Sequence, residues 1–156
     1  MTKSIVSQFY NAFKNHDAEK MASFYHEDAV FEDPAFGKLN AKQASAMWGM
    51  LMKRSKGDLQ VEFDVLHSDE NNALCNWEAK YKFGPKKRPI HNRIQAKMKF
   101  QDGKIVYHKD EFSFWKWSGM ALGPAGWLLG FTPIIHNKVQ KTVAILLADY
   151  MRETKV

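Results

Sequence analysis

Apolar and polar positions alternate with different periods along the chain, and each period predicts a different kind of element. From about Ser4 to Lys14, apolar residues recur every three or four positions, which predicts a helix with one buried face. Asp17 is a suitable N-cap for a second helix, which we expect to end near residues 26–28. Asn40 opens a third helix, because Gln43 stands at the spacing of a capping box.

The centre of the chain has the pattern of strands. A short strand at residues 29–32 leads to Asp33, because Pro34 cannot donate to a sheet and restricts the residue before it. Longer strand-like segments follow at residues 59–68, 73–83, 89–100 and 104–118. Asp102-Gly103 predicts a tight hairpin turn between the last two.

The C-terminal part combines an irregular apolar segment with a final helix. Glycine and proline interrupt residues 119–133, whose large apolar side chains we expect to cover an opening or a subunit contact. The helix follows at residues 134–152. Its apolar face is predicted to carry Ile135, Val139, Val143, Leu146, Leu147 and Tyr150.

The last predicted strand carries the most informative residues. Side chains at positions i and i+2 of a strand share a face, so His108 and Asp110 would lie in one row with Phe112 and Phe114. If this row faces inward, it places an acid and an imidazole in apolar surroundings. The alternative is that Asp110 pairs with neighbouring charges and His108 is a hydrogen-bonded core residue.

Length and composition indicate one globular domain. A chain of 156 residues with 45% hydrophobic and 26% charged residues is typical of a single domain with a substantial core. The one cysteine, Cys75, excludes an internal disulfide and a cysteine-based zinc cluster, and we expect a buried, inert thiol. No histidines have metal-ligand spacing with an acid on a common face, so we predict no metal and no cofactor.

Charge and hydropathy limit the kinds of partner that the protein is expected to bind. No secretory segment and no apolar run of about 20 residues occurs, so we expect a cytoplasmic protein without a membrane partner. The net charge of +6 hints at anionic partners, but the basic residues are mostly scattered. Their densest cluster, Lys86-Lys87-Arg88, lies between two prolines and is typical of a solvated turn. Since no phosphate-binding loop or zinc-finger spacing occurs, we predict no nucleic-acid partner.

The order of helix, helix, short strand, helix and four antiparallel strands resembles the nuclear transport factor 2-like superfamily, which includes SnoaL-like proteins and ketosteroid isomerase. Four segments carry the resemblance: Tyr10–Phe13, Phe31–Pro34, Trp77–Tyr81 and His108–Phe112. It covers residues 3–118 and implies an α+β fold, a cone-shaped curved antiparallel sheet wrapped around N-terminal helices. Residues 1–156 would form one domain, with the loop and C-terminal helix at 119–156 as an extension. That extension looks like a bacterial subset of uncharacterised members.

The same resemblance implies a cavity for small molecules and candidate residues around it. Asp110 and Asp33 match positions where the family carries acids. Asp110 would act as the base, and His108 would orient it or act as its proton partner. Asp33 would hydrogen-bond the ligand or His108. The predicted ligand-binding residues are Tyr10, Tyr25, Trp48, Trp77, Tyr81, Asn92 and Phe112. The arginine with two aspartates of epoxide hydrolases has no counterpart, since Arg93 is expected to point outward.

Three functions remain open from sequence alone. The first is an isomerase, cyclase or hydratase that uses Asp110 on a small apolar or aromatic molecule. The second is a non-catalytic protein that binds such a molecule. The third is a dimerisation or scaffold domain whose cavity is filled by its own side chains. The family resemblance implies a homodimer through the outer sheet face, where Trp115 and Trp117 are expected to pack.

Overall fold

Six strands and six helices make up the computed structural model of the protein, which describes residues 1–156. The strands are β1 (Tyr25–Asp33), β2 (Gly37–Asn40), β3 (Gln60–Ser68), β4 (Asn72–Phe83), β5 (Arg88–Gln101) and β6 (Lys104–Glu111). The helices are α1 (Thr2–Lys14), α2 (Ala18–Ala22), α3 (Ala41–Ser55), α4 (Phe114–Leu122), α5 (Pro124–Leu129) and α6 (Pro133–Glu153).

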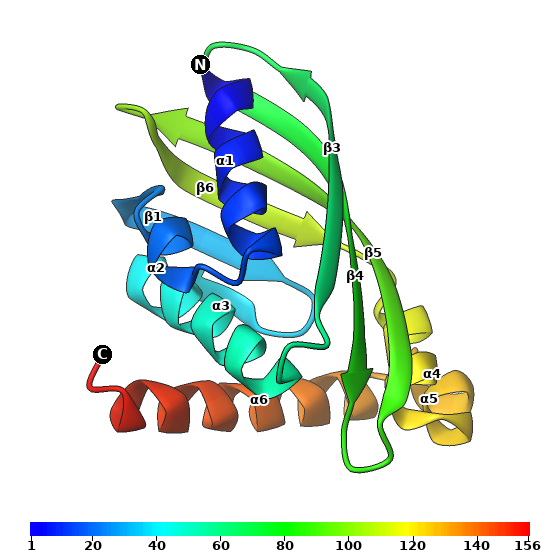
Figure 1. The fold of residues 1–156 in the computed structure, drawn as a ribbon. Helices are drawn as coiled ribbons and strands as arrows, with labels where there is room; N and C mark the ends of the chain where they lie inside the picture. The colour runs from blue at the N-terminus through cyan, green and yellow to red at the C-terminus, as the bar shows by residue number, and fades with distance from the viewer.

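The strands form one curved sheet in the order β2-β1-β6-β5-β4-β3. Only the β1–β6 pair is parallel, and the other neighbours are antiparallel. Helices α1 and α3 lie against the inner face of the curve, and α6 runs beneath α3 (Figure 1). Inward residues alternate with polar outward residues along β4 and β5, as expected for a sheet with one buried face. The predicted α+β cone with a C-terminal helix is confirmed.

Local signals placed several boundaries correctly. The Asn40 side chain accepts a hydrogen bond from the Gln43 amide, and the Gln43 side chain accepts one from the Asn40 amide, so the predicted capping box is present. Asp17 caps α2 by accepting from the Lys20 amide. Asp102 and Gly103 have positive φ angles of 52° and 73°, which form the tight turn between β5 and β6.

The first strand is longer than predicted, and a second strand was missed. β1 begins at Tyr25, which the apolar spacing placed in the preceding helix, because Tyr25 and residues 30–32 pair with β6. Residues 37–40 form β2 on the other edge of β1 instead of continuing the loop. Both pairings join segments that are distant in sequence or separated by a proline turn, so local periodicity does not reveal them.

The last strand is shorter than predicted. β6 ends at Glu111, and the Ser113 side chain accepts a hydrogen bond from the Lys116 amide to begin α4. Trp115 and Trp117 are therefore not on the outer sheet face. Trp117 is buried against Ile90 at the far end of the inner face. The predicted strand at 112–118 is wrong because a serine cap stops the extended pattern.

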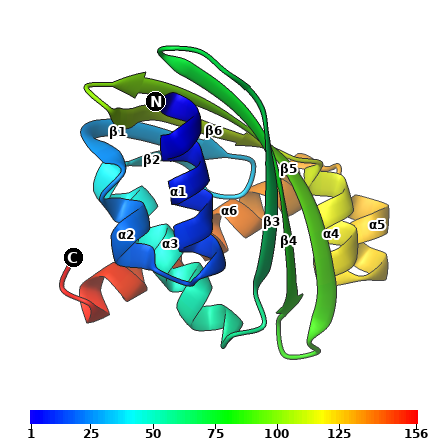
Figure 2. The same cartoon turned by 45° about the horizontal axis from the view of Figure 1, so that its top comes forward.

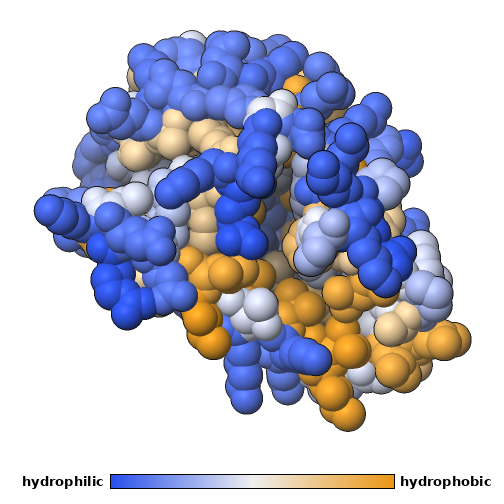
Figure 3. Space-filling model, turned by 60° about the horizontal axis from the view of Figure 1, so that its bottom comes forward, coloured by the Kyte–Doolittle hydropathy of each residue, from blue (hydrophilic) through white to orange (hydrophobic).

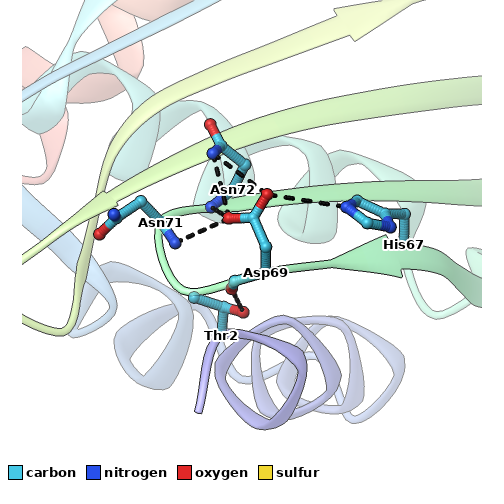
Figure 4. A network of polar contacts seen from close by, with 5 residues as sticks. All are labelled: Thr2, His67, Asp69, Asn71 and Asn72. Atoms are coloured by element: carbon cyan, nitrogen blue, oxygen red, sulfur yellow. Dashed lines mark hydrogen bonds and ion pairs between the residues drawn. The ribbon is translucent and has the colours of Figure 1, made fainter.

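A polar turn closes the β3–β4 hairpin beside the N-terminus. Asp69 accepts hydrogen bonds from the backbone amides of Asn71 and Asn72 at 2.9 and 2.8 Å, as Figure 4 shows. These bonds hold the pKa of Asp69 below its usual value. The Thr2 hydroxyl donates to the Asp69 carbonyl oxygen and ties α1 to this turn.

The C-terminal extension is a set of three packed helices. Figure 2 shows α4 and α5 side by side at the end of β5, with α6 continuing back beneath the cone. The predicted irregular segment is therefore largely helical. Along α6, Leu147 is buried and the other five predicted inward residues are half-buried, so its predicted face is confirmed. None of the helices has both the length and the apolar composition to span a bilayer.

Replacement of Gly126 by alanine tests how tightly α4 and α5 pack. A Cβ atom at Gly126 would overlap the Ser118 carbonyl oxygen, so Gly126→Ala should lower the free energy of unfolding by about 1–3 kcal/mol, the usual cost of overpacking. Urea unfolding measures this change. The matched control is Ala125→Ser at the neighbouring exposed position. Equal stability of both variants would contradict the close contact.

Candidate active site

A continuous chain of hydrogen bonds crosses the interior of the cone. The Trp48 indole Nε1 donates to the Tyr25 hydroxyl at 2.9 Å, and that hydroxyl is 2.9 Å from Nδ1 of His108. Nε2 of His108 lies 2.9 Å from Oδ1 of Asp110, and the Trp77 indole donates to the same oxygen at 3.3 Å. Helix α3 and strands β1, β4 and β6 supply these residues, so the chain links four elements of the fold.

The direction of these bonds assigns the proton positions. Because the Tyr25 oxygen accepts from Trp48, its own proton is free to point to Nδ1 of His108. Nδ1 is then an acceptor, and Nε2 carries the proton that is donated to Asp110. A doubly protonated His108 would leave the Tyr25 proton without an acceptor. The network therefore favours the His108 tautomer that carries its proton on Nε2 and donates it to Asp110.

Aromatic rings hold His108 in place. Phe9 and Phe31 meet the imidazole edge-on at centroid distances of 5.7 and 5.0 Å, and the Trp48 ring stacks on it at 6.0 Å. His108 is fully buried and Asp110 is 2% exposed, so these two residues of the row face inward. A buried polar pair with no room to rotate keeps a single geometry.

Asp110 has one oxygen in this network and one outside it. Oδ1 accepts both hydrogen bonds, whereas Oδ2 has no protein partner and is not sealed from solvent. Asp110 lines an open cleft of about 440 Å³ between the β1–β2 turn and the end of β6. The cleft is lined by Glu32, Asp33, Pro34, Gly37, Lys38, Lys109, Asp110, Glu111 and Phe112.

Asp33 is the second acid of the cleft. Its Oδ1 accepts from the backbone amides of Ala35 and Phe36 at 2.9 and 2.6 Å, which makes a tight turn around Pro34. Burial raises the pKa of Asp33 to about 7, the Phe36 amide opposes this, and the nearby Asp110 carboxylate adds to it. At neutral pH the protonated and ionised forms of Asp33 are both well populated.

The structure brings some predicted ligand-binding residues together and separates others. Tyr25, Trp48 and Trp77 join the hydrogen-bond network, and only Phe112 lines the cleft. Tyr10 stacks on Phe63 at 5.3 Å. Its buried hydroxyl has no partner, and burial raises its pKa well above the usual value.

Two further predicted residues lie away from the network. Tyr81 accepts a hydrogen bond from the Trp117 indole at 2.9 Å, which ties β4 to α4. Asn92 is buried on β5 opposite Ala79. Arg93 points outward as predicted and lies 3.6 Å from Glu78. Cys75 is buried as expected, and burial raises the pKa of its thiol to about 12.

Two features of the site were missed from sequence. Lys38 lines the cleft only because residues 37–40 form β2. The Asp33-Pro34 turn is held from outside by α6, because Nε2 of His136 lies 2.6 Å from the Pro34 carbonyl oxygen and Gln140 donates to it at 3.3 Å. The i and i+4 spacing of these two polar residues on a mostly apolar helix was the available signal.

The family is established by comparison of the sequence. The model of the SnoaL-like domain matches residues 6–108, which is more than half of the chain. The chain belongs to the SnoaL-like family. The match ends at His108, so it includes the histidine of the network, and Asp110 lies just beyond it. No curated protein matches the chain.

Solved structures agree with this SnoaL-like fold. An LEH-like epoxide hydrolase of M. tuberculosis is 19% identical, with 81% of this chain and 93% of that chain covered and a TM-score of 0.58. The epoxide hydrolase/cyclase-like enzyme SalBIII is 14% identical, with 71% and 89% covered and a TM-score of 0.62. A ketosteroid isomerase-like protein from Catenulispora acidiphila is 14% identical, with 79% and 95% covered and a TM-score of 0.61. At these identities the likeness concerns the fold.

Removal of the Tyr25 hydroxyl tests the network. Tyr25→Phe leaves the Trp48 indole and Nδ1 of His108 without partners, and should lower the free energy of unfolding by about 2–4 kcal/mol. Urea unfolding measures the change. The control is Tyr107→Phe, which loses only a hydrogen bond to Glu32 near the surface and should cost less than about 1 kcal/mol. Equal losses of unfolding free energy in the two variants would show that the buried network stabilises the fold no more than a hydrogen bond near the surface.

The raised pKa of Asp33 predicts a pH-dependent stability. Its folded-state pKa of about 7 lies above the unfolded value of 3.8, so the folded protein binds more protons between these values and stability falls as pH rises from 4 to 7. Because Asp33 is partly exposed, we expect a discounted loss of about 1–2 kcal/mol.

The measurement compares urea unfolding of the parent and Asp33→Asn at mildly acid and mildly alkaline pH. The amide keeps an acceptor for the Ala35 and Phe36 amides and does not ionise. The variant should therefore lose less stability than the parent as pH rises, and Asp64→Asn, at an exposed position of β3, should behave like the parent. A variant that follows the parent curve would refute the assignment.

Proposed function

We propose that this SnoaL-like protein is an acid–base enzyme that moves a proton next to a carbonyl group of a small molecule. The observation that carries this proposal is the division of Asp110, with Oδ1 fixed by His108 and Trp77 and Oδ2 free beside the cleft. A carboxylate that is oriented on one side and free on the other is suited to act as a general base.

The two acids of the cleft can take complementary roles. Oδ2 of Asp110 would remove a proton from the carbon beside the carbonyl, and the electron pair of the broken C–H bond would move onto the carbonyl oxygen. Protonated Asp33 would donate a hydrogen bond to that oxygen. In a substrate with a β,γ carbon–carbon double bond, the C=O bond would then re-form, the double bond would shift into conjugation, and the γ carbon would take the proton from Asp110. Different protonation of neighbouring acids is a known basis of such chemistry.

His108 would be a positioning residue in this reaction. It is fully buried and donates Nε2–H to Asp110, so it fixes the carboxylate without touching the substrate. Tyr25 fixes the tautomer of His108 in turn. The support for this role is the one-way order of donors from Trp48 to Asp110.

The cleft also restricts the substrate. Most of its lining is polar or charged, and Phe112 provides an apolar wall. Its volume of about 440 Å³ suits a compact molecule. Lys109 is engaged by Glu32 and Glu111 at 3.5 and 3.6 Å, whereas Lys38 has no ion pair. We therefore propose a small carbonyl compound whose apolar part contacts Phe112.

A homodimer and a cytoplasmic location stay predictions. The outer sheet face that would form the dimer carries exposed basic residues, including Lys80, Arg93, Lys97 and Lys99. Since Trp115 and Trp117 lie in α4, they do not supply an apolar centre to this face. Arg93 and Lys97 are already paired with Glu78 and Glu111, whereas Lys80 and Lys99 would need acidic groups of the partner copy.

Replacement of Asp110 by asparagine tests the proposed chemistry. The probe is the β,γ-unsaturated isomer of cyclohexenone, whose conversion into the conjugated isomer is followed by ultraviolet absorbance. Asp110→Asn keeps an acceptor for His108 and Trp77 but replaces Oδ2 by an amide nitrogen, so the variant should fold. Its rate should fall by about 10²–10⁴, the usual contribution of a general base.

The control for this assay is Asp64→Asn, which makes the same chemical change at an exposed position of β3. It should retain the parent rate, and circular dichroism should show that all three proteins are folded. A parent protein that does not accelerate the conversion over buffer, or an Asp110→Asn variant as fast as the parent, would contradict the proposed base.

A further inference from the structure

The C-terminal extension exposes a group of large apolar side chains, which we call the apolar tip. Leu128, Phe131 and Ile134 are 70%, 74% and 78% exposed, far more than the other large apolar residues of the fold except Met1, Ile145 and Val156. Figure 3 shows apolar residues gathered on the lower side of the molecule, where these helices lie. The tip consists of Trp115, Trp127, Leu128, Leu129, Phe131 and Ile134.

The packing of α5 explains why these side chains face outward. Gly126 and Gly130 lie so close to Ser118 of α4 that neither position has room for a side chain. The contact between α5 and α4 is therefore made through glycine, and the Trp127 ring packs over Gly119 of α4. Leu128, Leu129 and Phe131 stay exposed beside it. The Trp115 indole donates to the Trp127 carbonyl oxygen at 2.9 Å and closes the same contact. These contacts hold α5 against α4 and so fix the position of the tip.

The chain segment that carries the tip has no acidic residue of its own. No acidic residue occurs between Glu111 and Asp149, a segment that carries Lys116, Lys138 and Lys141. A second source of positive charge lies beside it, because the Arg88 guanidinium packs against Gly123 at the α4–α5 junction. Arg88 ends the β4–β5 turn with exposed Lys86 and Lys87, so this basic turn borders the tip. The tip and the β4–β5 turn together form a surface with an apolar centre and a basic edge.

From this arrangement we propose that the apolar tip docks on the surface of an anionic lipid bilayer. Tryptophan, leucine and phenylalanine enter the boundary between headgroups and acyl chains, and nearby lysine and arginine bind anionic headgroups. The expected absence of a membrane partner rested on the lack of a spanning segment, and surface docking needs none. The proposal is independent of the chemistry of Asp110.

Vesicle co-sedimentation tests this docking. The probes are vesicles of equal parts phosphatidylcholine and phosphatidylglycerol, compared with pure phosphatidylcholine. The protein should sediment with the anionic vesicles, and less so as added salt screens the basic residues. The fluorescence of Trp115 and Trp127 should shift to shorter wavelength on binding. Failure to sediment with anionic vesicles at low salt would overturn the proposal.

Variants separate the apolar and basic contributions. Leu128→Glu with Phe131→Glu should reduce the partition coefficient at least about tenfold, because two large apolar side chains no longer leave water. Lys87→Glu should reduce the partition coefficient about fivefold or more. The matched control is Leu66→Glu on β3, which is exposed but distant in the sequence and outside the tip. Circular dichroism verifies that each variant folds.

The same variants distinguish a lipid surface from a second copy of the chain. Gel filtration would detect a dimer of the parent that Leu128→Glu with Phe131→Glu converts into a monomer. That result without vesicle binding would assign the tip to self-association and overturn the proposal. Unchanged vesicle binding of the double variant would overturn it as well, since the basic turn alone would then account for binding.

Discussion

The burial of His108 is the constraint on which the centre of this structure depends. An imidazole without solvent access needs a partner for each ring nitrogen, because an unpaired buried polar group costs about 1–3 kcal/mol. Tyr25 and Asp110 supply these partners from β1 and from β6 itself, and Trp48 and Trp77 satisfy the groups behind them. The position of one histidine therefore relates four elements of the cone to one another.

The same network gives Asp110 its asymmetry. Both interior donors bind Oδ1, so the network uses one side of the carboxylate and leaves Oδ2 to the cleft. The adjacent Asp33 turn is braced from outside by His136 and Gln140 of α6. The C-terminal extension thus stabilises one wall of the site, although it lies beyond the segment that matches the SnoaL-like domain.

The C-terminal extension has buried residues that pack against the cone and exposed apolar residues that face solvent. Its residue Leu147 joins the main core of the cone, and Trp117 and Ala121 form a smaller cluster with Ile90. Its glycine-mediated contact between α4 and α5 turns the remaining large apolar residues towards solvent. An exposed apolar surface of this kind is uncommon on a protein that has no partner for it. The cone and the tip can therefore serve different interactions.

The sequence by itself determined the features that depend on neighbouring residues. The capping box of Asn40, the N-cap of Asp17, the turn at Asp102-Gly103 and the shared face of His108 and Asp110 follow from backbone geometry over a few residues. The family resemblance predicted the cone-shaped curved sheet. The serine cap at Ser113 was also local, but the aromatic alternation around it favoured a strand.

Only the tertiary structure decided which groups meet at the site. The parallel pairing of β1 with β6 brings Tyr25 to His108, and the edge strand β2 brings Lys38 to the cleft. Two aromatic residues expected to line a pocket pack in the core instead: Tyr10 stacks on Phe63, and Trp48 meets Phe9 and Phe13 edge-on. Apolar periodicity marks such residues as inward but does not say whether they enclose space or fill it. That outcome depends on the summed volumes of side chains from several elements, which no local pattern contains.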